Sequence, residues 1–213
     1  MGTSTRQQRT HKAILNAAED LFLRDGFLGV SMDQVAETAA VSKQTVYAHF
    51  QSKEALFLAF TQALMEPAGD ELGKRVSEQS LDLEFEDYLR AFAHQQLAIV
   101  VTPKLMQLRR LAIGEATRFP ELGATLHKLG PARSINRLEF AFRHYRNIGQ
   151  IRAPNLREAA SNFNWLIMGA PVNDAMILGD AAIPGRELLE AHAEECVRVF
   201  LAAYGANPPA YFE

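Results

Sequence analysis

The amino-acid sequence predicts an all-α protein, and three observations favour this fold class. Apolar residues recur at helical spacing along most of the chain, and no segment alternates convincingly as a strand. Proline or glycine separates the periodic segments from one another. The chain has 213 residues, of which 48% are hydrophobic and 22% charged. This composition is ordinary for a globular protein with ample core-forming material.

The overall composition also limits the cellular compartment and the binding partners that we expect for the protein. A formal net charge of −3 gives no global sign of nucleic-acid binding, so any such surface has to be local. Cys196 is the one cysteine, which excludes an internal disulfide and is typical of a reducing compartment. No signal-peptide pattern or long uninterrupted apolar run is present. We therefore expect a cytoplasmic protein without a membrane partner.

Apolar periodicity and capping residues predict the first two helices. The first carries an inward stripe and ends at Asp25-Gly26, where glycine can take a left-handed conformation and Phe27 can fold back onto the last turn. Ser31 followed by Gln34 forms the capping box of the second helix. The inward residues of the two helices are Ile14, Ala17, Ala18, Leu21, Phe22, Met32, Val35, Ala36 and Ala39.

Capping serines and helix-breaking residues predict the remaining helices in turn. Ser42 caps a third helix and Ser52 a fourth, which runs through Leu64. Five or six further helices follow, and the residues after about 202 have the composition of a tail. The predicted breaks lie near Pro103, Pro120, Gly130-Pro131, Pro154-Asn155 and Pro184-Gly185.

The third helix has an outward face suited to DNA. Val46 and Phe50 are four residues apart, so they share one face and pack inward. A short capped helix that follows another across the turn of residues 40–42 is a helix-turn-helix arrangement, whose second helix enters a major groove. The outward residues, none of them acidic, are Lys43, Gln44, Thr45, Tyr47, Ala48 and His49.

Three basic residues precede the first predicted helix stripe. Arg6, Arg9 and Lys12 form a segment without acids. One interpretation is an arm that follows the DNA backbone or reaches a minor groove; the other is a frayed, solvated terminus. The sequence leaves both open.

Residues 13–57, AILNAAEDLFLRDGFLGVSMDQVAETAAVSKQTVYAHFQSKEALF, resemble the DNA-binding domain of the TetR family of bacterial transcription regulators. The resemblance includes the string V-S-x-x-x-x-Y-x-H-F-x-S-K-E-x-L. It implies a homodimer with a three-helix DNA-binding domain and a larger helical domain that binds an effector. We place the first domain at residues 1–52 and the second at residues 53–213.

The resemblance also implies which residues contact double-stranded operator DNA. Lys53 matches a phosphate-contacting lysine, and Ser31 a capping hydroxyl that touches a phosphate. Two positions depart from the family pattern. Ala40 stands where glycine is usual, at a cost of about 1 kcal/mol if its φ is positive. Gln44 replaces a common glycine and can reach an adenine. The DNA-binding set is Ser31, Ser42, Lys43, Gln44, Thr45, Tyr47, His49 and Lys53.

Residues 104–131 resemble the C-terminal domain of the AefR-like subgroup of these regulators. TetR-family C-terminal domains enclose an effector pocket among their middle helices, and we look there for lining side chains. An aromatic stripe at helical spacing also suits an ordinary core, and the sequence leaves that alternative open. The predicted ligand-binding residues are Phe92, Gln96, Met106, Arg109, Phe140, His144, Phe163, Trp165 and Met168.

Two apolar stripes predict a dimer interface. One runs along residues 156–178 and the other along the last helix, both at 4-3-4-3 spacing. Two such helices from each subunit would form a four-helix bundle and set the recognition helices about 34–36 Å apart. The alternative is that both stripes pack within one chain. The predicted interface residues are Phe163, Ile167, Leu189, Ala193, Cys196 and Phe200.

Two other functional classes, an enzyme and an interaction module without DNA, fit the sequence less well. A helical enzyme would use Cys196 with His192, or Glu84 with Glu86, but no triad order or phosphate loop accompanies them. A metal site at His192, Glu195 and Cys196 is less favoured than a packed thiol. An interaction module without DNA would leave the outward face of residues 43–49 unexplained. We predict a regulator without a cofactor, a repressor that a small apolar or aromatic effector releases from its operator.

Overall fold

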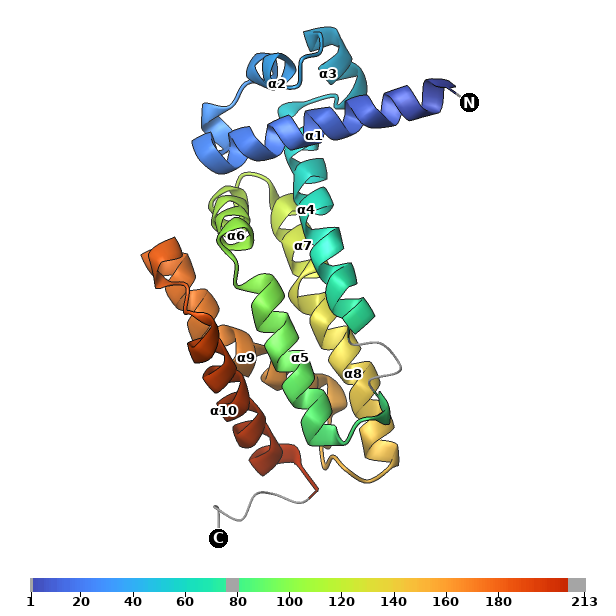
Figure 1. Ribbon diagram of the computed structural model, residues 1–213, viewed down its shortest axis with the longest axis vertical. Coiled ribbons are helices and arrows are strands. Elements are labelled where there is room, and N and C mark those ends of the chain that lie inside the picture. The colour runs from blue at the N-terminus through green and yellow to red at the C-terminus, as the bar shows by residue number, and fades with distance from the viewer. Residues whose placement is uncertain (1, 76–80, 207–213) are drawn as a thin grey trace. The chain divides into compact units, whose positions relative to one another are not determined.

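The computed structural model describes residues 2–75 and 81–206, with side chains from residue 6 onward except for 71–80. In this part of the chain the regular elements are helices, apart from an isolated bridge between Ile151 and Gly205 (Figure 1). The chain packs into two compact units. The first unit is Met1–Glu66 with Gln107–His127, and the second is Pro67–Met106 with Lys128–Glu213. The predicted boundary after residue 52 therefore falls inside the first unit.

The first unit is built on three N-terminal helices and the first part of a fourth. Their aromatic side chains form one cluster: Phe22 lies edge-on to Phe57 at 4.9 Å, and Phe27 contacts both Phe57 and Phe119. The inward stripe predicted for the first helix is buried. The helices that contribute to this unit are α1 (Gly2–Gly29), α2 (Met32–Thr38), α3 (Lys43–His49), α4 (Lys53–Arg75), α6 (Pro103–Glu115) and α7 (Pro120–Leu129).

The predicted helix ends of this unit are confirmed. Gly26 has φ of 73° and interrupts the helical geometry of α1, and Phe27 stacks back on Phe22 with ring centroids 6.0 Å apart. Ser31 and Gln34 form the capping box that starts α2. The backbone of Ala55 donates to the Ser52 hydroxyl at 3.1 Å, so Ser52 caps α4.

The N-terminal basic segment is neither a free arm nor a frayed terminus. The helix α1 begins at Gly2, so Arg6, Arg9 and Lys12 lie on its first turns. All three side chains are exposed. Their spacing of three residues keeps them close to one side of the helix.

The second unit is a helical bundle in which proline or glycine marks the start of each later helix, as predicted. Proline occupies the first position of α8, where its missing N–H costs no hydrogen bond. Asn155 caps α9 by accepting from Glu158 N at 3.2 Å. Its principal helices are α5 (Phe85–Val100), α8 (Pro131–Asn147), α9 (Leu156–Leu178) and α10 (Arg186–Tyr204), with a short 3₁₀ turn η2 (Asp180–Ala182).

The two stripes predicted to form a dimer interface are the core of this unit. Phe200 of α10 lies 4.7 Å from the ring of Phe163 on α9 and 5.4 Å from Phe142 on α8. Five of the six predicted interface residues are at most 2% exposed, and Leu189 packs against the same core. That assignment is wrong because the stripes face α5 and α8 of their own chain. The buried set is Phe163, Ile167, Ala193, Cys196 and Phe200.

Candidate nucleic-acid interface and effector site

The helix α3 is held by two buried side chains and exposes the rest. Val46 is fully buried and Phe50 is 5% exposed, so one face is fixed in the core of the first unit. The side chains of Lys43, Gln44 and Tyr47 are exposed on the other face. With seven residues, α3 is too short to be stable alone. Its outward face is therefore positioned by packing, as a recognition helix requires.

Hydroxyl groups fix where α2 and α3 begin. Thr45 N donates to the Ser42 hydroxyl at 3.0 Å, and the Thr45 hydroxyl lies 2.8 Å from it. Ser31 accepts from Gln34 N at 3.2 Å, while its own N–H donates to the Gln34 side chain at 2.7 Å. Each serine hydroxyl thereby pairs with one of the backbone N–H groups that a helix start leaves without an intrahelical partner. Contacts of these serines with phosphates stay a prediction.

An acidic residue beside the recognition helix was not predicted from the sequence. Lys43 Nζ lies 2.7 Å from Oδ1 of Asp33, which belongs to α2. The hydrogen bond that Lys43 donates to Asp33, and second the negative charge of Asp33, raise the pKa of Lys43. Both side chains are more than half exposed, so the pair is a surface ion pair of small energy. A pattern read along one helix cannot reveal a carboxylate supplied by its neighbour.

His49 packs on the start of α1. Its ring centroid lies 5.6 Å from that of His11, which in turn stacks on Phe50 at 4.9 Å. Burial and, second, the nearby His49 lower the pKa of His11. The half-buried His49 is thus tied to α1 and is less available to DNA than Tyr47.

Lys53 joins three parts of the first unit. Its Nζ donates to the backbone carbonyls of Phe27 and Val30, each at 2.9 Å. The same ammonium lies 4.3 Å from the centroid of the Phe27 ring. This geometry binds the start of α4 to the last turn of α1 and to Val30 just after it. A contact with a phosphate, which the family resemblance implies, would have to use what remains of the amine's donors.

The turn between α2 and α3 carries strain at the predicted residue. Ala40 has φ of 53°, the left-handed conformation that glycine adopts freely. The expected departure from the family pattern at this position is thus visible in the backbone. The turn keeps its helix-turn-helix geometry, since Ala40 N donates to Glu37 O at 3.1 Å and Val41 N to Ala36 O at 3.0 Å.

Eight of the nine predicted effector-binding residues fall into three groups, and the half-buried His144 is the ninth. One group is buried in the second unit, and its members are Phe92, Gln96, Met106, Phe163 and Met168. Arg109 lies in the first unit, where burial lowers the pKa of its guanidinium. Phe140 and Trp165 are 59% and 49% exposed, so their predicted inward orientation is wrong. Within the second unit, the exposed Phe140 and Trp165 do not join the buried members of the set.

Helical spacing explains why Phe140 and Trp165 are exposed. On α8 the inward row is Leu138, Phe142 and Tyr145, so Phe140 points away from it. On α9 Asn164 and Met168 are buried, and Trp165 lies one residue past that row. His144 is half-buried, and its ring packs edge-on against Tyr145 at 5.2 Å.

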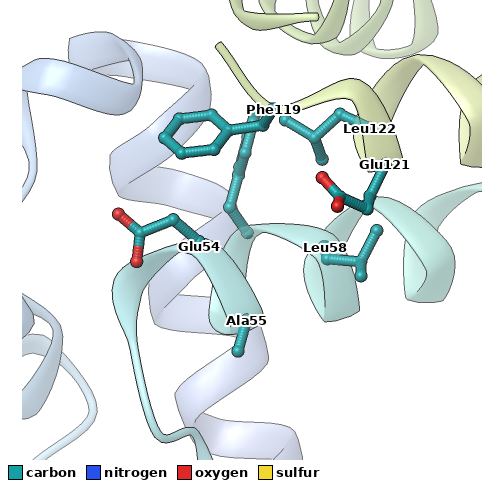
Figure 2. A pocket seen from close by; sticks show the side chains of 7 residues that line it. Glu54, Ala55, Leu58, Phe119, Glu121 and Leu122 are labelled. Atoms are coloured by element: carbon teal, nitrogen blue, oxygen red, sulfur yellow. The ribbon is translucent and has the colours of Figure 1, made fainter.

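A small open pocket of about 260 Å³ lies in the first unit, between the start of α4 and the segment around the start of α7 (Figure 2). Its lining is mostly apolar, and Glu54 and Glu121 place carboxylates on two sides of it. None of the residues predicted to bind an effector lines it. Its lining residues are Glu54, Ala55, Phe57, Leu58, Phe119, Glu121 and Leu122.

The groups considered for enzymatic chemistry are engaged in packing. Burial raises the pKa of Cys196 to about 11, so its thiol stays protonated. His192 Nε2, the ring nitrogen nearer to the Cys196 thiol, donates to Ile167 O at 2.8 Å and so has no lone pair to accept the thiol proton. Glu84 accepts from Gln150 at 2.7 Å and Glu86 pairs with Arg90. Across the described residues, no three or more His, Cys, Asp or Glu side chains gather as metal ligands.

The family of the chain is decided by two matches that together cover most of it. Residues 14–60 match the N-terminal domain described as bacterial regulatory proteins of the tetR family. Residues 87–206 match the C-terminal domain of AefR-like transcriptional repressors. The chain belongs to the TetR family. It is a DNA-binding transcription regulator and not an enzyme, as the sequence predicted. Over the part of the chain that is described, no helix has the length and apolar character to span a membrane.

Solved structures and curated proteins agree with this placement. A TetR-family regulator from Mesorhizobium loti has 32% identity and a TM-score of 0.86, covering 94% of this chain and 98% of that one. The flavonoid-responsive regulator FrrA has 32% identity and a TM-score of 0.76, covering 93% and 98%. The regulator UidR of Escherichia coli K12 is 31% identical over 125 residues, 57% of this chain and 59% of its own. The match thus spans little more than half the length of UidR.

Proposed function

We propose that this TetR-family regulator is a homodimeric repressor that an apolar, aromatic effector releases from its operator. The observation that carries the DNA-binding part is the recognition helix α3. Two buried anchors fix it, and Lys43, Gln44 and Tyr47 face outward. Donors and an aromatic ring on a packed helix suit base edges and phosphates in a major groove.

The aromatic nature of the effector rests on two supports. The second unit has a core rich in phenylalanine, tyrosine and methionine, side chains that adapt to flat apolar ligands. FrrA, which shares 32% identity over nearly the whole chain, responds to flavonoids according to its name. Binding in this unit would shift a population between conformations that fit and do not fit two adjacent major grooves.

An electrophoretic shift assay tests the DNA-binding part. The probe is the intergenic DNA beside the protein's own gene, and the control is a shuffled duplex of the same length and composition. We expect a shift of the intergenic probe at protein concentrations that leave the shuffled duplex free. Equal binding to both duplexes would contradict operator recognition.

We propose that the dimer surface lies on the outer faces of α9 and α10. These two helices pack on each other, and their inward stripes are used within the chain. Large apolar side chains nevertheless remain outside: Trp165 and Ile177 on α9 are 49% and 71% exposed, and Leu188 and Val199 on α10 are 68% and 38% exposed. Exposed apolar side chains on two adjacent helices are typical of a protein–protein contact.

Light scattering on charged variants tests this surface. Substituting Trp165→Glu together with Val199→Glu places charge on the face without changing a buried residue. We expect this protein to be monomeric and to bind operator DNA poorly. The matched control is Ile113→Glu, which changes a 52% exposed aliphatic residue in the first unit and should stay dimeric. A dimer in the doubly substituted protein would move the interface elsewhere.

A further inference from the structure

Two amide side chains face each other inside the apolar core of the second unit. Gln96 lies in the C-terminal half of α5 and is 2% exposed, while Asn164 lies in the N-terminal half of α9 and is 1% exposed. Gln96 Nε2 donates to Asn164 Oδ1 at 2.9 Å. Their sequence neighbours on the same helix faces, Phe92, Phe163 and Met168, are buried and apolar.

This hydrogen bond uses one polar group of each amide and leaves the other polar group of each without a partner. Gln96 Oε1 and Asn164 Nδ2 are buried and have no partner among the described residues. The conclusion does not depend on how the two amide groups are turned, because one bond between two amides always leaves one carbonyl oxygen and one NH₂ group over. The pair therefore keeps one unpaired acceptor on α5 and one unpaired donor on α9.

A core does not need such a pair for stability. Two apolar side chains of similar shape avoid the cost of leaving polar atoms unpaired in a low-dielectric interior. Nearly all buried polar groups in proteins have partners, so an acceptor and a donor left together on facing helices point to a third group that pairs with both.

We infer that Gln96 and Asn164 recognise the polar group of the effector, a neutral hydroxyl or carboxamide carried on an apolar aromatic body. The inference rests on the proposed ligand-responsive function and names the chemistry of its ligand. A hydroxyl donates to Gln96 Oε1 and accepts from Asn164 Nδ2 at once. An ionised carboxylate has no hydrogen to donate to the oxygen, and an ammonium has no lone pair for the NH₂ group.

The surrounding side chains suit the apolar part of such a ligand. Phe92 and Phe163 have ring centroids 6.4 Å apart on the two helices that carry the amides. Met168 follows Asn164 by one turn, and its unbranched side chain can repack around a guest. Recognition by one donor–acceptor pair within an apolar surrounding gives strong selection, because analogues without the polar group leave the amides unpaired.

The test measures the affinity of three probes of one shape by equilibrium dialysis against the full chain. The probes are 2-naphthol, which donates and accepts, 2-methoxynaphthalene, which only accepts, and 2-naphthoate, which is an anion at pH 7. We expect 2-naphthol to bind at least about tenfold more tightly than the other two, since a site built to pair a hydroxyl rejects analogues that lack it. Similar affinities for all three probes would overturn the inference and leave the amides as a hydrated or purely structural pair.

Variants assign the preference to the amides. In Gln96→Met with Asn164→Leu, both partners become apolar, so we expect a folded protein with the preference reduced to about twofold or less. The control Ile167→Val trims the same core on α9 and should keep the wild-type preference. A tenfold preference that persists in the double variant would overturn the assignment. Should that variant fail to fold, the wild-type affinity order still decides.

The outcome is separable from that of the proposed function. Dialysis reports the probe preference whether or not the protein binds DNA, and the shift assay reports operator binding without any probe. A protein that prefers 2-naphthol but does not shift its intergenic DNA would retain the amide site and lose the regulatory proposal. A protein that shifts this DNA but binds the probes equally would retain the regulator and lose the amide site.

Discussion

Removing the ammonium of Lys53 should destabilise the first unit markedly. Lys53→Met keeps the length of the side chain and removes the donor to the carbonyls of Phe27 and Val30, both at 2.9 Å. Hydrogen bonds that involve a charged group contribute about 1.5–3 kcal/mol each. The contact with the Phe27 ring adds about 0.5–1 kcal/mol. Because one amine makes all three contacts and the terms are not additive, we expect a total of about 2–4 kcal/mol.

A thermal melt measures this loss. For a chain of this size each kcal/mol lowers Tm by about 2–4 °C, so the expected decrease is about 5–15 °C. The control is Lys12→Met, which removes an exposed lysine from α1 of the same unit and should leave Tm within about 1 °C. An unchanged Tm for Lys53→Met, with a salt slope of operator binding lower by about one unit, would refute the reasoning. Such a result would make Lys53 a phosphate contact and not a link between α1 and α4.

Three further expectations concern α3 and the segments that hold it. Tyr47→Ala should weaken binding to the operator more than binding to shuffled DNA, and equal losses in a shift assay would contradict a position near the bases. Ala40→Gly should raise the free energy of unfolding by about 0.5–1 kcal/mol because φ is 53° there; a decrease in denaturant titrations would contradict strain at this residue. The lowered pKa of His11 means that the unfolded chain takes up a proton first as the pH falls, so this residue reduces stability as the pH drops through about 6.5. His11→Phe should therefore lose less stability than the wild type between pH 7.5 and 5.5, and equal losses would assign the effect to other groups.

Local signals predicted the secondary structure well. The capping box at Ser31, the turn at Gly26 and the proline-marked starts of α6, α7 and α8 depend on residues adjacent in sequence. Periodicity also separated buried from exposed faces where one face is apolar and the other polar, as on α1. Sequence reasoning succeeded wherever the deciding contact lies within about one helical turn.

The errors occurred where the deciding partner lies on another helix. On α9 and α10 apolar residues occur on more than one face, and the stripe with regular spacing proved to be the one that packs inside the chain. Helical spacing predicts that Phe140 and Trp165 share an inward face with Phe163 and Met168, but each of the two lies off the inward row of its helix. The pairing of Gln96 with Asn164, 68 residues apart, has no sequence signal beyond two amides within apolar segments.

The ion pair between Lys43 and Asp33 places a carboxylate on the recognition surface. This carboxylate competes with DNA phosphates for the Lys43 ammonium. In the proposed complex, a DNA phosphate competes with a carboxylate that is already 2.7 Å from the ammonium. A lysine that is already paired with a carboxylate gains less from a phosphate contact than a lysine without such a partner. The carboxylate also adds a negative charge beside the recognition helix, and this charge repels the DNA backbone wherever no base contacts compensate. The pair would thus lower affinity for random DNA more than affinity for the operator, so an acid on the neighbouring helix adds discrimination to a surface whose other outward residues supply attraction.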